Sequence, residues 1–300
     1  MRFGDEREST NFTDDTGRGG GLGGGGFGGG GLGCLLPLIA SRFGIGGVVV
    51  LVIGYFLLSS LGGLGGLGGG GGGSVAPGSQ VSRPSGQSSL DPATKHFTLQ
   101  VLASTEDTWT KLLQAKGIRY TPTNLHFYSE ADQSGCGAAQ SAMGPFYCPT
   151  DTNIYLDTEF FSELSRRFQA PGDFAQAYVI AHEVGHHVQD LTGTLGDAER
   201  MQARASEAEG NAIQVKIELQ ADCYAGVWAA NAKTPQGQPV MEQGDFEEGM
   251  RAAEAIGDDT LQRQAQGRVV PDSFTHGTSA QRTETLQRGY KSGNPDVCKF

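Results

Sequence analysis

The stretch His182-Glu183-Val184-Gly185-His186 contains the residue types of a zinc hydrolase site at the spacing that such a site needs. In a helix, residues four apart lie one above the other, so both imidazoles can reach one metal ion. Glu183 lies about 100° round the helix from His182, close enough to take a proton from an activated water molecule. The motif therefore predicts a zinc site with His182 and His186 as ligands and Glu183 as general base.

The alternative is a chance match on an exposed helix, where His and Glu are ordinary. An apolar stripe at helical spacing argues against chance and predicts a partly buried helix, where imidazoles need partners. Gly185 costs this helix about 1 kcal/mol relative to Ala, and its bare surface would let a second helix or the substrate approach the metal. The alternative is that any small residue would serve at position 185. The stripe consists of Ala177, Ile180, Ala181, Val184, Val188 and Leu191.

A third ligand is expected from a second helix, over about residues 203–230. Catalytic zinc sites commonly use three protein ligands, and two His with one Glu is a known set. Glu218 and Asp222 are four apart, so both can face the His pair. We predict Glu218, with its longer side chain, as the ligand, and Asp222 as the acceptor that orients a ligating His. A solvated acidic helix face is the alternative.

His276 is the remaining candidate for a catalytic role. A tetrahedral intermediate needs a hydrogen-bond donor for its developing oxyanion, and a His from a later segment often supplies it. The alternative is a His that only helps to terminate a loop, before a last helix capped by Thr278 and Gln281. Arg282 is expected to pair with Asp222 or to bind a substrate carboxylate. His187, about 100° from His186, is expected not to be a ligand.

Several longer strings carry a resemblance to the gluzincin metallopeptidases and, more closely, to the bacterial family of neutral zinc metallopeptidases. The resemblance runs from about residue 91 to the C-terminus, with a looser likeness around Arg7-Glu8-Ser9-Thr10-Asn11. It implies a zincin fold with His182, His186 and Glu218 on zinc and Glu183 as base. The N-terminus departs from the family pattern by being more acidic and richer in glycine. The strings are Ser134-Gly135-Cys136-Gly137, Gly144-Pro145-Phe146-Tyr147-Cys148, residues 181–189, Glu218-Leu219-Gln220-Ala221-Asp222-Cys223 and Thr275-His276-Gly277-Thr278-Ser279.

The first ninety residues differ in composition from the rest. Residues 19–33 and 62–73 are nearly all Gly, and such stretches bury little, so we expect them to be flexible. Residues 43–61 between them carry no charge, and about 20 residues span a bilayer core. A cleaved signal peptide is the alternative, but the charged leader is too long for one. The predicted parts are a flexible Gly-rich cytoplasmic segment 1–42, a transmembrane helix 43–61, a Gly/Ser-rich linker 62–90 and a zinc metallopeptidase domain 91–300.

The basic residues near this predicted span set its orientation. Four arginines precede it, whereas the first basic residue after it is Arg83. The positive-inside rule therefore predicts a single-pass membrane protein with a cytoplasmic N-terminus and an extracytoplasmic catalytic domain. The four are Arg2, Arg7, Arg18 and Arg42.

The cysteines agree with that orientation. Cys34 would lie on the cytoplasmic side, which leaves an even number of cysteines outside, in an oxidising compartment. Four cysteines allow three pairings. We favour Cys136–Cys148, which closes a short loop, and Cys223–Cys298, which would hold the tail beside the metal helix. A second zinc site is the alternative, and no C-x-x-C spacing supports it.

The order of expected elements indicates an α+β fold: a zincin-like metallopeptidase domain, mainly helical, with a small sheet, behind the single transmembrane helix. We expect strands at 96–103, 124–128 and 153–156, followed by the helices that carry the metal ligands. In a zincin an edge strand holds the substrate backbone, and residues 153–156 are our candidate for it. A buried structural strand is the alternative.

The sequence thus predicts a membrane-anchored zinc metallopeptidase whose partner is a protein or peptide substrate. One alternative is a membrane-anchored binding module with a structural zinc or a decayed site, against which the intact Glu183 argues. A cell-wall peptide amidase is another, because it shares the chemistry. The net charge of −11 disfavours nucleic acid as a partner.

Overall fold

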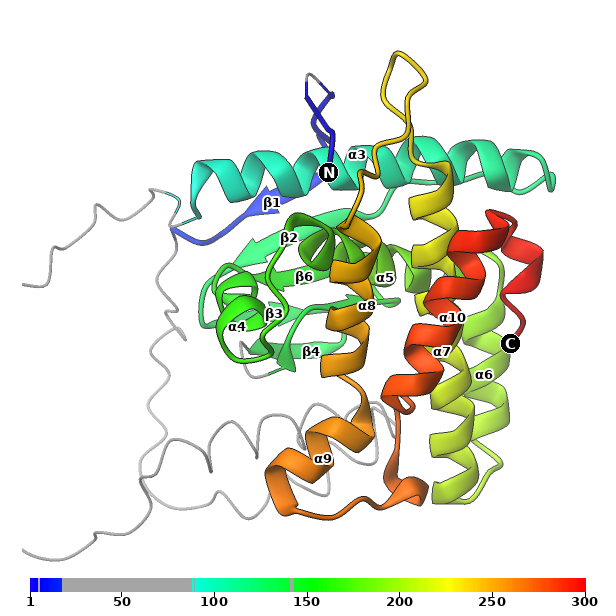
Figure 1. The fold of residues 1–300 in the computed structure, drawn as a ribbon. Helices are drawn as coiled ribbons and strands as arrows, with labels where there is room; N and C mark the ends of the chain where they lie inside the picture. Colours follow the sequence, from blue (N-terminus) through cyan, green and yellow to red (C-terminus); the bar gives the residue numbers. More distant parts are fainter. Residues whose placement is uncertain (5, 18–87, 89, 141–142) are drawn as a thin grey trace, which may run out of the picture.

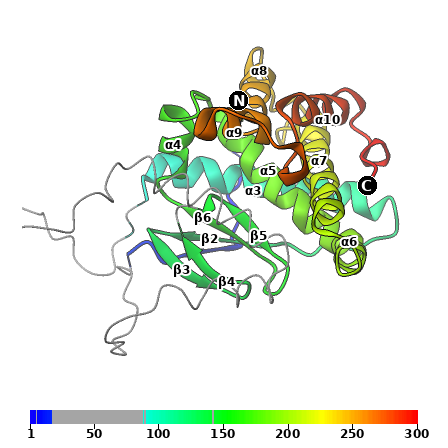
Figure 2. The ribbon, with the colours of Figure 1, turned by 90° about the horizontal axis from the view of Figure 1, so that it is seen from below.

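The computed structural model describes residues 1–4, 6–17, 88, 90–140 and 143–300. Within them a small sheet forms one layer and a group of helices the other (Figures 1 and 2). The strands are β1 (Phe12–Asp14), β2 (Asn124–Tyr128), β3 (Ala131–Ser134), β4 (Gly137–Gln140), β5 (Phe146–Cys148) and β6 (Asn153–Asp157). The helices are α3 (Pro92–Gln114), α4 (Phe160–Arg166), α5 (Asp173–Leu191), α6 (Thr194–Gln202), α7 (Glu207–Asn231), α8 (Asp245–Ala255), α9 (Asp258–Gln266) and α10 (Ser279–Ser292), with 3₁₀ turns η2 (Pro271–Ser273) and η3 (Pro295–Val297). The expected α+β class, mainly helical with a small sheet, is confirmed.

The main sheet has the strand order β1-β2-β6-β5, and β3 and β4 form a separate hairpin. Strands β1, β2 and β6 are parallel to one another, whereas β5 runs antiparallel to β6. The strands expected at 124–128 and 153–156 are confirmed. The prediction that 153–156 is the edge strand is wrong, because β6 lies between β2 and β5. The edge beside it is β5, a strand too short for its sequence pattern to reveal.

The strand expected at His96–Ala103 is also wrong, because these residues lie inside helix α3. Leu99 and Leu102 continue with Trp109 as an apolar stripe at helical spacing, and all three side chains are 0% exposed. The helix begins earlier, where the Asp91 side chain accepts a hydrogen bond from the Thr94 amide and Pro92 occupies the first turn.

Helix α5 carries the HExxH motif through the centre of the molecule. The stripe residues Ala177, Ile180, Ala181, Val184 and Val188 are each at most 2% exposed. The helix contacts α3, α7, α8 and strand β5, so it is covered on several sides. This burial rules out the alternative of a chance motif on an exposed helix.

Glycines bring α7 and α10 into direct backbone contact. A Cβ atom added to Gly289 would lie 2.0 Å from the Cys223 carbonyl oxygen, and one added to Gly226 would lie 2.1 Å from the carbonyl oxygen of Leu286. Real Cβ atoms do not approach so closely, so each helix can lie where it does only because its neighbour has no side chain there. This packing fixes the position of α7, which carries Glu218.

The favoured disulfide pairing is confirmed. Cys136 bonds to Cys148 across 12 residues, and Cys223 bonds to Cys298 across 75 residues. The second bond holds the C-terminal tail against α7, next to the helix contact described above. The alternative of a second zinc site on these four cysteines is therefore excluded.

Residues 1–17 differ from the flexible cytoplasmic segment expected over 1–42. Strand β1 pairs in parallel with β2, in the register Phe12↔Leu125. The Arg2 amide donates to the Val240 carbonyl, and the Ser9 amide to that of Leu99. The predicted flexibility is therefore wrong for residues 1–4 and 6–17, and the folded domain expected at 91–300 also contains β1. Strand β1 has only three residues and so shows no clear alternation in the sequence, and the nearby glycine-rich stretch 19–33 led us to expect the whole segment to be flexible.

The predicted transmembrane helix 43–61 lies outside the described residues, as do most of the segment 1–42 and the linker 62–90. Among the residues that the structure does describe, no helix is both long enough and apolar enough to cross a membrane.

Replacing Gly289 by Ala is expected to lower the free energy of unfolding by about 3 kcal/mol, because the new methyl group overlaps backbone atoms of α7. Gly196→Ala in α6 is the matched control, since its Cβ would meet only the Arg200 side chain at 3.4 Å. That control is expected to be neutral or to stabilise by up to about 1 kcal/mol. Urea denaturation of both variants measures the difference, and equal stabilities would contradict the close-packing account.

Candidate metal centre

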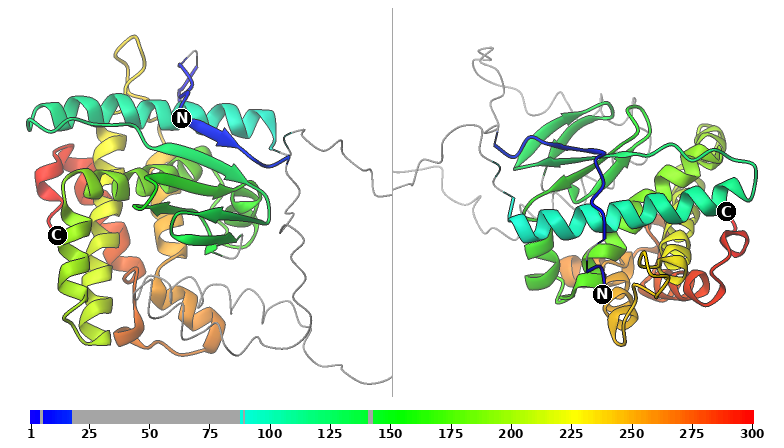
Figure 3. Two further views of the ribbon diagram at one scale, coloured as in Figure 1. Left: turned by 180° about the vertical axis from the view of Figure 1, so that it is seen from behind. Right: turned by 90° about the horizontal axis from the view of Figure 1, so that it is seen from above.

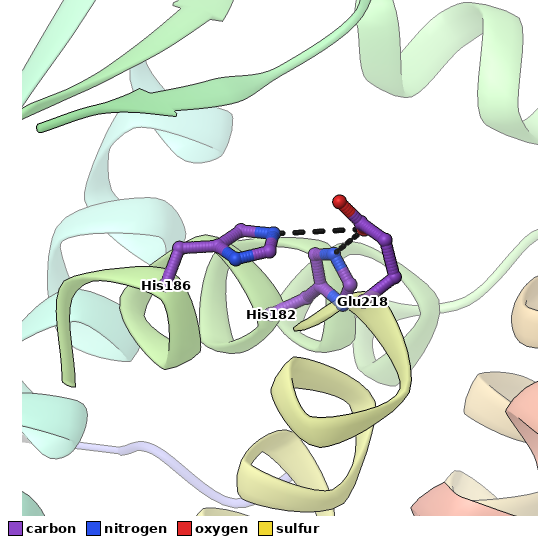
Figure 4. A group of neighbouring side chains, drawn as sticks. All are labelled: His182, His186 and Glu218. Carbon is purple, nitrogen blue, oxygen red and sulfur yellow. Dashed lines mark hydrogen bonds and ion pairs between the residues drawn. The ribbon is translucent and has the colours of Figure 1, made fainter. Parts of the chain in front are cut away.

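His182 and His186 from α5 and Glu218 from α7 point toward one another (Figure 4). The Glu218 Oε2 atom lies 3.2 Å from His182 Nε2 and 3.6 Å from His186 Nε2. All three donor atoms lie within 4.8 Å of one another. Atoms bound to one tetrahedral zinc at 2.0–2.2 Å are about 3.4 Å apart, so these separations match the edges of such a site.

Each of the three side chains is held by a further side chain through its other polar atom. His182 Nδ1 lies 2.8 Å from Asp222 Oδ1 and His186 Nδ1 lies 2.9 Å from Gln189 Oε1. Glu218 Oε1 accepts a hydrogen bond of 2.9 Å from Gln214. Partners of this kind fix the orientation of metal ligands.

The hydrogen-bond network also fixes which imidazole nitrogen faces the centre. Gln189 Nε2 donates to the Ile217 carbonyl oxygen, so its Oε1 faces His186 and accepts from Nδ1. Asp222 likewise accepts from His182 Nδ1. In the neutral imidazoles both Nε2 lone pairs then point at the Glu218 carboxylate, which is also an acceptor. Three acceptor atoms that face one point repel one another unless a positive charge lies between them. A zinc ion would supply that charge, and two His nitrogens with one carboxylate oxygen are donors that zinc prefers.

Asp222 joins three helices through one buried carboxylate. Its Oδ1 accepts from Tyr178 on α5 at 2.5 Å as well as from His182. Arg282 on α10 donates from Nε to Oδ2 and from Nη2 to Oδ1, both at 2.9 Å. The carboxylate is 0% exposed. Asp222 therefore accepts a hydrogen bond from a predicted ligand, as the sequence analysis expected. Of the two roles expected for Arg282, the structure shows the pairing with Asp222.

The excess of carboxylates gives the centre an affinity for positive charge. Burial lowers the pKa of His182, but the charge of Asp222 and its hydrogen bond outweigh burial and raise that pKa to about 10. Burial raises the pKa of Asp222, but Arg282 and His182 outweigh it and lower that pKa to about 2. In the absence of a metal ion a proton therefore takes up the positive charge that these groups demand.

Glu183 and Gly185 complete the motif on α5. Glu183 is only 7% exposed, and its charge acts on both imidazoles. A Cβ atom on Gly185 would lie 3.0 Å from both Cα and the carbonyl oxygen of Ala221 on α7. The bare surface therefore admits the second helix, which is one of the two roles expected for Gly185, and an Ala there would require the α7 backbone to move by a few tenths of an ångström.

His276 lies on a loop that packs against α7 beside Glu218. Gly277, its neighbour, faces the side chains of Val215 and Leu219, to which an added Cβ would lie 3.3 Å. Asp258 holds the loop by accepting the His276 amide at 2.6 Å. Burial lowers the pKa of the His276 imidazole, but the hydrogen bond with Asp258 and the charge of Glu218 raise it. The structure thus brings His276 near the centre, while its catalytic role stays a prediction.

His187 points away from the three converging side chains, as expected. Its Nε2 lies 2.6 Å from the Thr121 carbonyl oxygen, and the ring is 1% exposed. Sequence reasoning missed the roles of Gln189, Gln214 and Tyr178. Gln189 and Tyr178 lie three and four residues from the ligands on the same helix, and that spacing was the available signal.

Comparison with known proteins agrees with this geometry. The family model described as "Putative neutral zinc metallopeptidase" matches residues 1–300. The chain belongs to this family. YpfJ of Escherichia coli (strain K12) is 45% identical over 305 residues, which cover 99% of this chain and 98% of YpfJ. Rv2575 of Mycobacterium tuberculosis is 43% identical over 203 residues, or 65% of this chain and 66% of that protein.

Both relatives are uncharacterized proteins, so they identify no substrate. No solved structure matches the chain. The family match includes the N-terminal residues as well as the HExxH helix, so the resemblance expected mainly from residue 91 onward extends over the whole chain.

The Asp222→Asn substitution is expected to cost about 3–5 kcal/mol of stability, because it leaves the buried Arg282 guanidinium without its counter-charge. It is also expected to weaken zinc binding by about 10–100-fold, because His182 loses its charged acceptor. The double variant Asp222→Asn with Arg282→Met removes both charges and should recover part of the stability but none of the zinc affinity. Thermal unfolding and competitive zinc titration separate the two effects. Full recovery of zinc affinity in the double variant would contradict the orienting role of Asp222.

Proposed function

We propose that this chain is a zinc-dependent metallopeptidase that hydrolyses peptide bonds. The observation that carries the proposal is the convergence of His182 Nε2, His186 Nε2 and Glu218 Oε2, each with its outer atom already partnered. Two His and one Glu are the ligand set of known zinc peptidases and leave one coordination position open. Membership of the zinc metallopeptidase family supports the same reading.

The three side chains would hold the zinc ion. Bound there, zinc would lower the pKa of a water molecule toward about 7 and polarise the scissile carbonyl group. Glu183, one position from His182 on the same helix, would accept the proton from that water and pass it to the leaving amine. Glu183 is 7% exposed and its charge acts on both imidazoles, which supports a position beside the metal centre.

A peptide substrate would bind in extended form along strand β5. This strand is the antiparallel edge of the sheet in the described part of the chain, and it contacts α5. Tyr147 on β5 reaches α5 directly, since its hydroxyl donates to Asp190 at 2.8 Å. A strand added to β5 would therefore lie next to the helix that carries the metal ligands, in the manner of a zincin.

His276 would donate a hydrogen bond to the developing oxyanion. The loop that carries it is held rigidly by Asp258, which accepts the amides of Thr275, His276 and Gly277. A donor held in place before the reaction stabilises the transition state without reorganisation.

The catalytic domain would work outside the cytoplasm, and the apolar residues 43–61 would associate it with a membrane. The two disulfide bonds support this location, because such bonds persist in oxidising compartments. The uncharged apolar stretch 43–61 supports the attachment.

Glu183→Gln is expected to retain zinc and to lower kcat at least about 100-fold, because the amide cannot accept the proton. Glu218→Ala is expected to lose zinc as well. Glu199→Gln on the exposed face of α6 removes the same charge away from the centre and should change neither. Cleavage of a peptide library and elemental analysis of the purified proteins provide both readouts.

The same experiment separates the other functions. Undiminished cleavage in Glu183→Gln would remove the base assignment. Zinc bound at full stoichiometry with no cleavage by the wild-type protein would favour a binding module with structural zinc. Release of amino groups from cell-wall peptides, but not from the library, would favour the amidase.

His276→Gln is expected to lower kcat by about 100–1000-fold, with zinc content unchanged and little change in KM. The effect is confined to kcat because the donor would act on charge that develops only in the transition state. His96→Gln on the surface of α3 is the matched control and should leave kcat unchanged. A purely structural role for His276 would instead lower thermal stability with kcat preserved in the folded fraction.

A further inference from the structure

The string Arg7-Glu8-Ser9-Thr10-Asn11 contributes nothing to the metal centre, yet it is built into the domain that contains it. Residues 1–4 and 6–17 (the N-terminal segment) cross α3 and end in strand β1 (Figure 3). The Leu125 amide donates to the Asn11 carbonyl at 3.0 Å, and the Asp15 amide donates to that of Phe127 at 3.0 Å. The segment therefore extends the main sheet by one strand.

Glu106 on α3 is the group that holds this segment. Its Oε1 atom accepts hydrogen bonds from Ser9 Oγ at 2.5 Å and Asn11 Nδ2 at 2.8 Å. Its Oε2 atom accepts from Arg7 at 2.9 Å. The residue is only 5% exposed, and a buried carboxylate without such partners is costly. Helix α3 therefore carries a buried carboxylate whose hydrogen-bond partners come from the N-terminal segment.

The residues that precede 18–87 and those that follow it contact each other at one place in the fold. Thr16 Oγ1 lies 3.1 Å from Ser88 Oγ, and Lys95 Nζ donates to Asp14 Oδ2 at 2.7 Å. These contacts join the last described residues before the intervening sequence to the first ones after it. Both ends of that sequence therefore start from the same edge of the folded domain.

A single membrane crossing between the two ends is incompatible with these contacts. It would place β1 and β2, or Arg7 and Glu106, on opposite sides of a hydrocarbon layer about 30 Å thick. Two hydrogen-bonded strands of one sheet cannot form across that layer, and neither can the ion pair between Arg7 and the buried Glu106.

We propose that residues 1–17 lie on the same side of the membrane as the metal centre, as an integral part of the catalytic domain. This replaces the expectation of a cytoplasmic N-terminus opposite an extracytoplasmic domain. The positive-inside rule counted Arg2 and Arg7, but both are committed within the fold, Arg2 to Glu242 at 3.0 Å and Arg7 to Glu106 and Asp107. Because these two arginines form ion pairs within the folded domain, their presence before residues 43–61 does not indicate on which side of the membrane the N-terminus lies.

Cysteine labelling in the full-length protein tests the proposal. In a Cys34→Ser background, Thr10→Cys marks the N-terminal segment and Ser292→Cys marks α10, both at exposed positions. A membrane-impermeant maleimide is applied to right-side-out spheroplasts before and after lysis. The proposal expects both positions to show the same labelled fraction before lysis. Labelling of one position with protection of the other would overturn it.

The location of the whole domain is a separate outcome of the same experiment. Protection of both positions until lysis would preserve the shared side and would contradict only the extracytoplasmic location proposed for the enzyme. Circular dichroism of each purified variant checks that the added cysteine leaves the protein folded, so that unfolded protein is not mistaken for an accessible segment.

Direct proximity provides a second test that does not depend on membrane access. Thr16→Cys combined with Ser88→Cys, again with Cys34→Ser, is expected to form a disulfide on mild oxidation. A protease site introduced within 62–73 then cuts the intervening chain, and the two fragments should stay linked until reductant is added. Thr16→Cys alone is the control and should release its fragment. Release from the paired variant under oxidising conditions would overturn the proposal.

Discussion

The metal centre depends on the buried negative charge of Asp222. An isolated carboxylate at 0% exposure would be unstable, and the paired hydrogen bonds from Arg282 make it tolerable. The same carboxylate orients His182 from α5 and receives the Tyr178 hydroxyl. One charge therefore fixes α5, α7 and α10 relative to one another, and Glu218, one turn before Asp222 on α7, is positioned as a consequence.

Close backbone packing supplies the distances that this charge network needs. Gly185 lies between the two His residues and touches the backbone of α7 at Ala221. A helix contact through side chains would separate the axes by a further layer of atoms, and Glu218 could not then reach within 3.2 Å of His182. On the other side of α7, Gly226 and Gly289 give α10 an equally close approach, which lets Arg282 reach Asp222. These glycines are needed because they let the helices pack closely enough to form the site, and not because they make the chain flexible.

The converging side chains could be predicted because helical spacing is a local property of sequence. His182, His186, Glu218 and Asp222 each follow from i, i+4 relations on two helices. Loop length favoured the Cys136–Cys148 pair, which left Cys223 and Cys298 to each other. The edge strand could not be predicted in the same way. Which strand lies at an edge depends on pairing between distant segments, and β5 has only three residues to display a pattern. Helix α3 was misread at its start because buried polar residues such as Gln100 bind the N-terminal segment, which no local pattern reveals.

The N-terminal segment has a mechanical connection to the catalytic helix through α3. Glu106 binds the segment on one face of α3, while the helix packs against α5. Strand β1 extends the same sheet whose opposite edge, β5, contacts α5 through Tyr147 and Asp190. The HExxH helix is therefore supported from two directions by structure that the first seventeen residues help to complete. This explains physically why a match to one metallopeptidase family extends over residues 1–300 and does not begin at the catalytic helices.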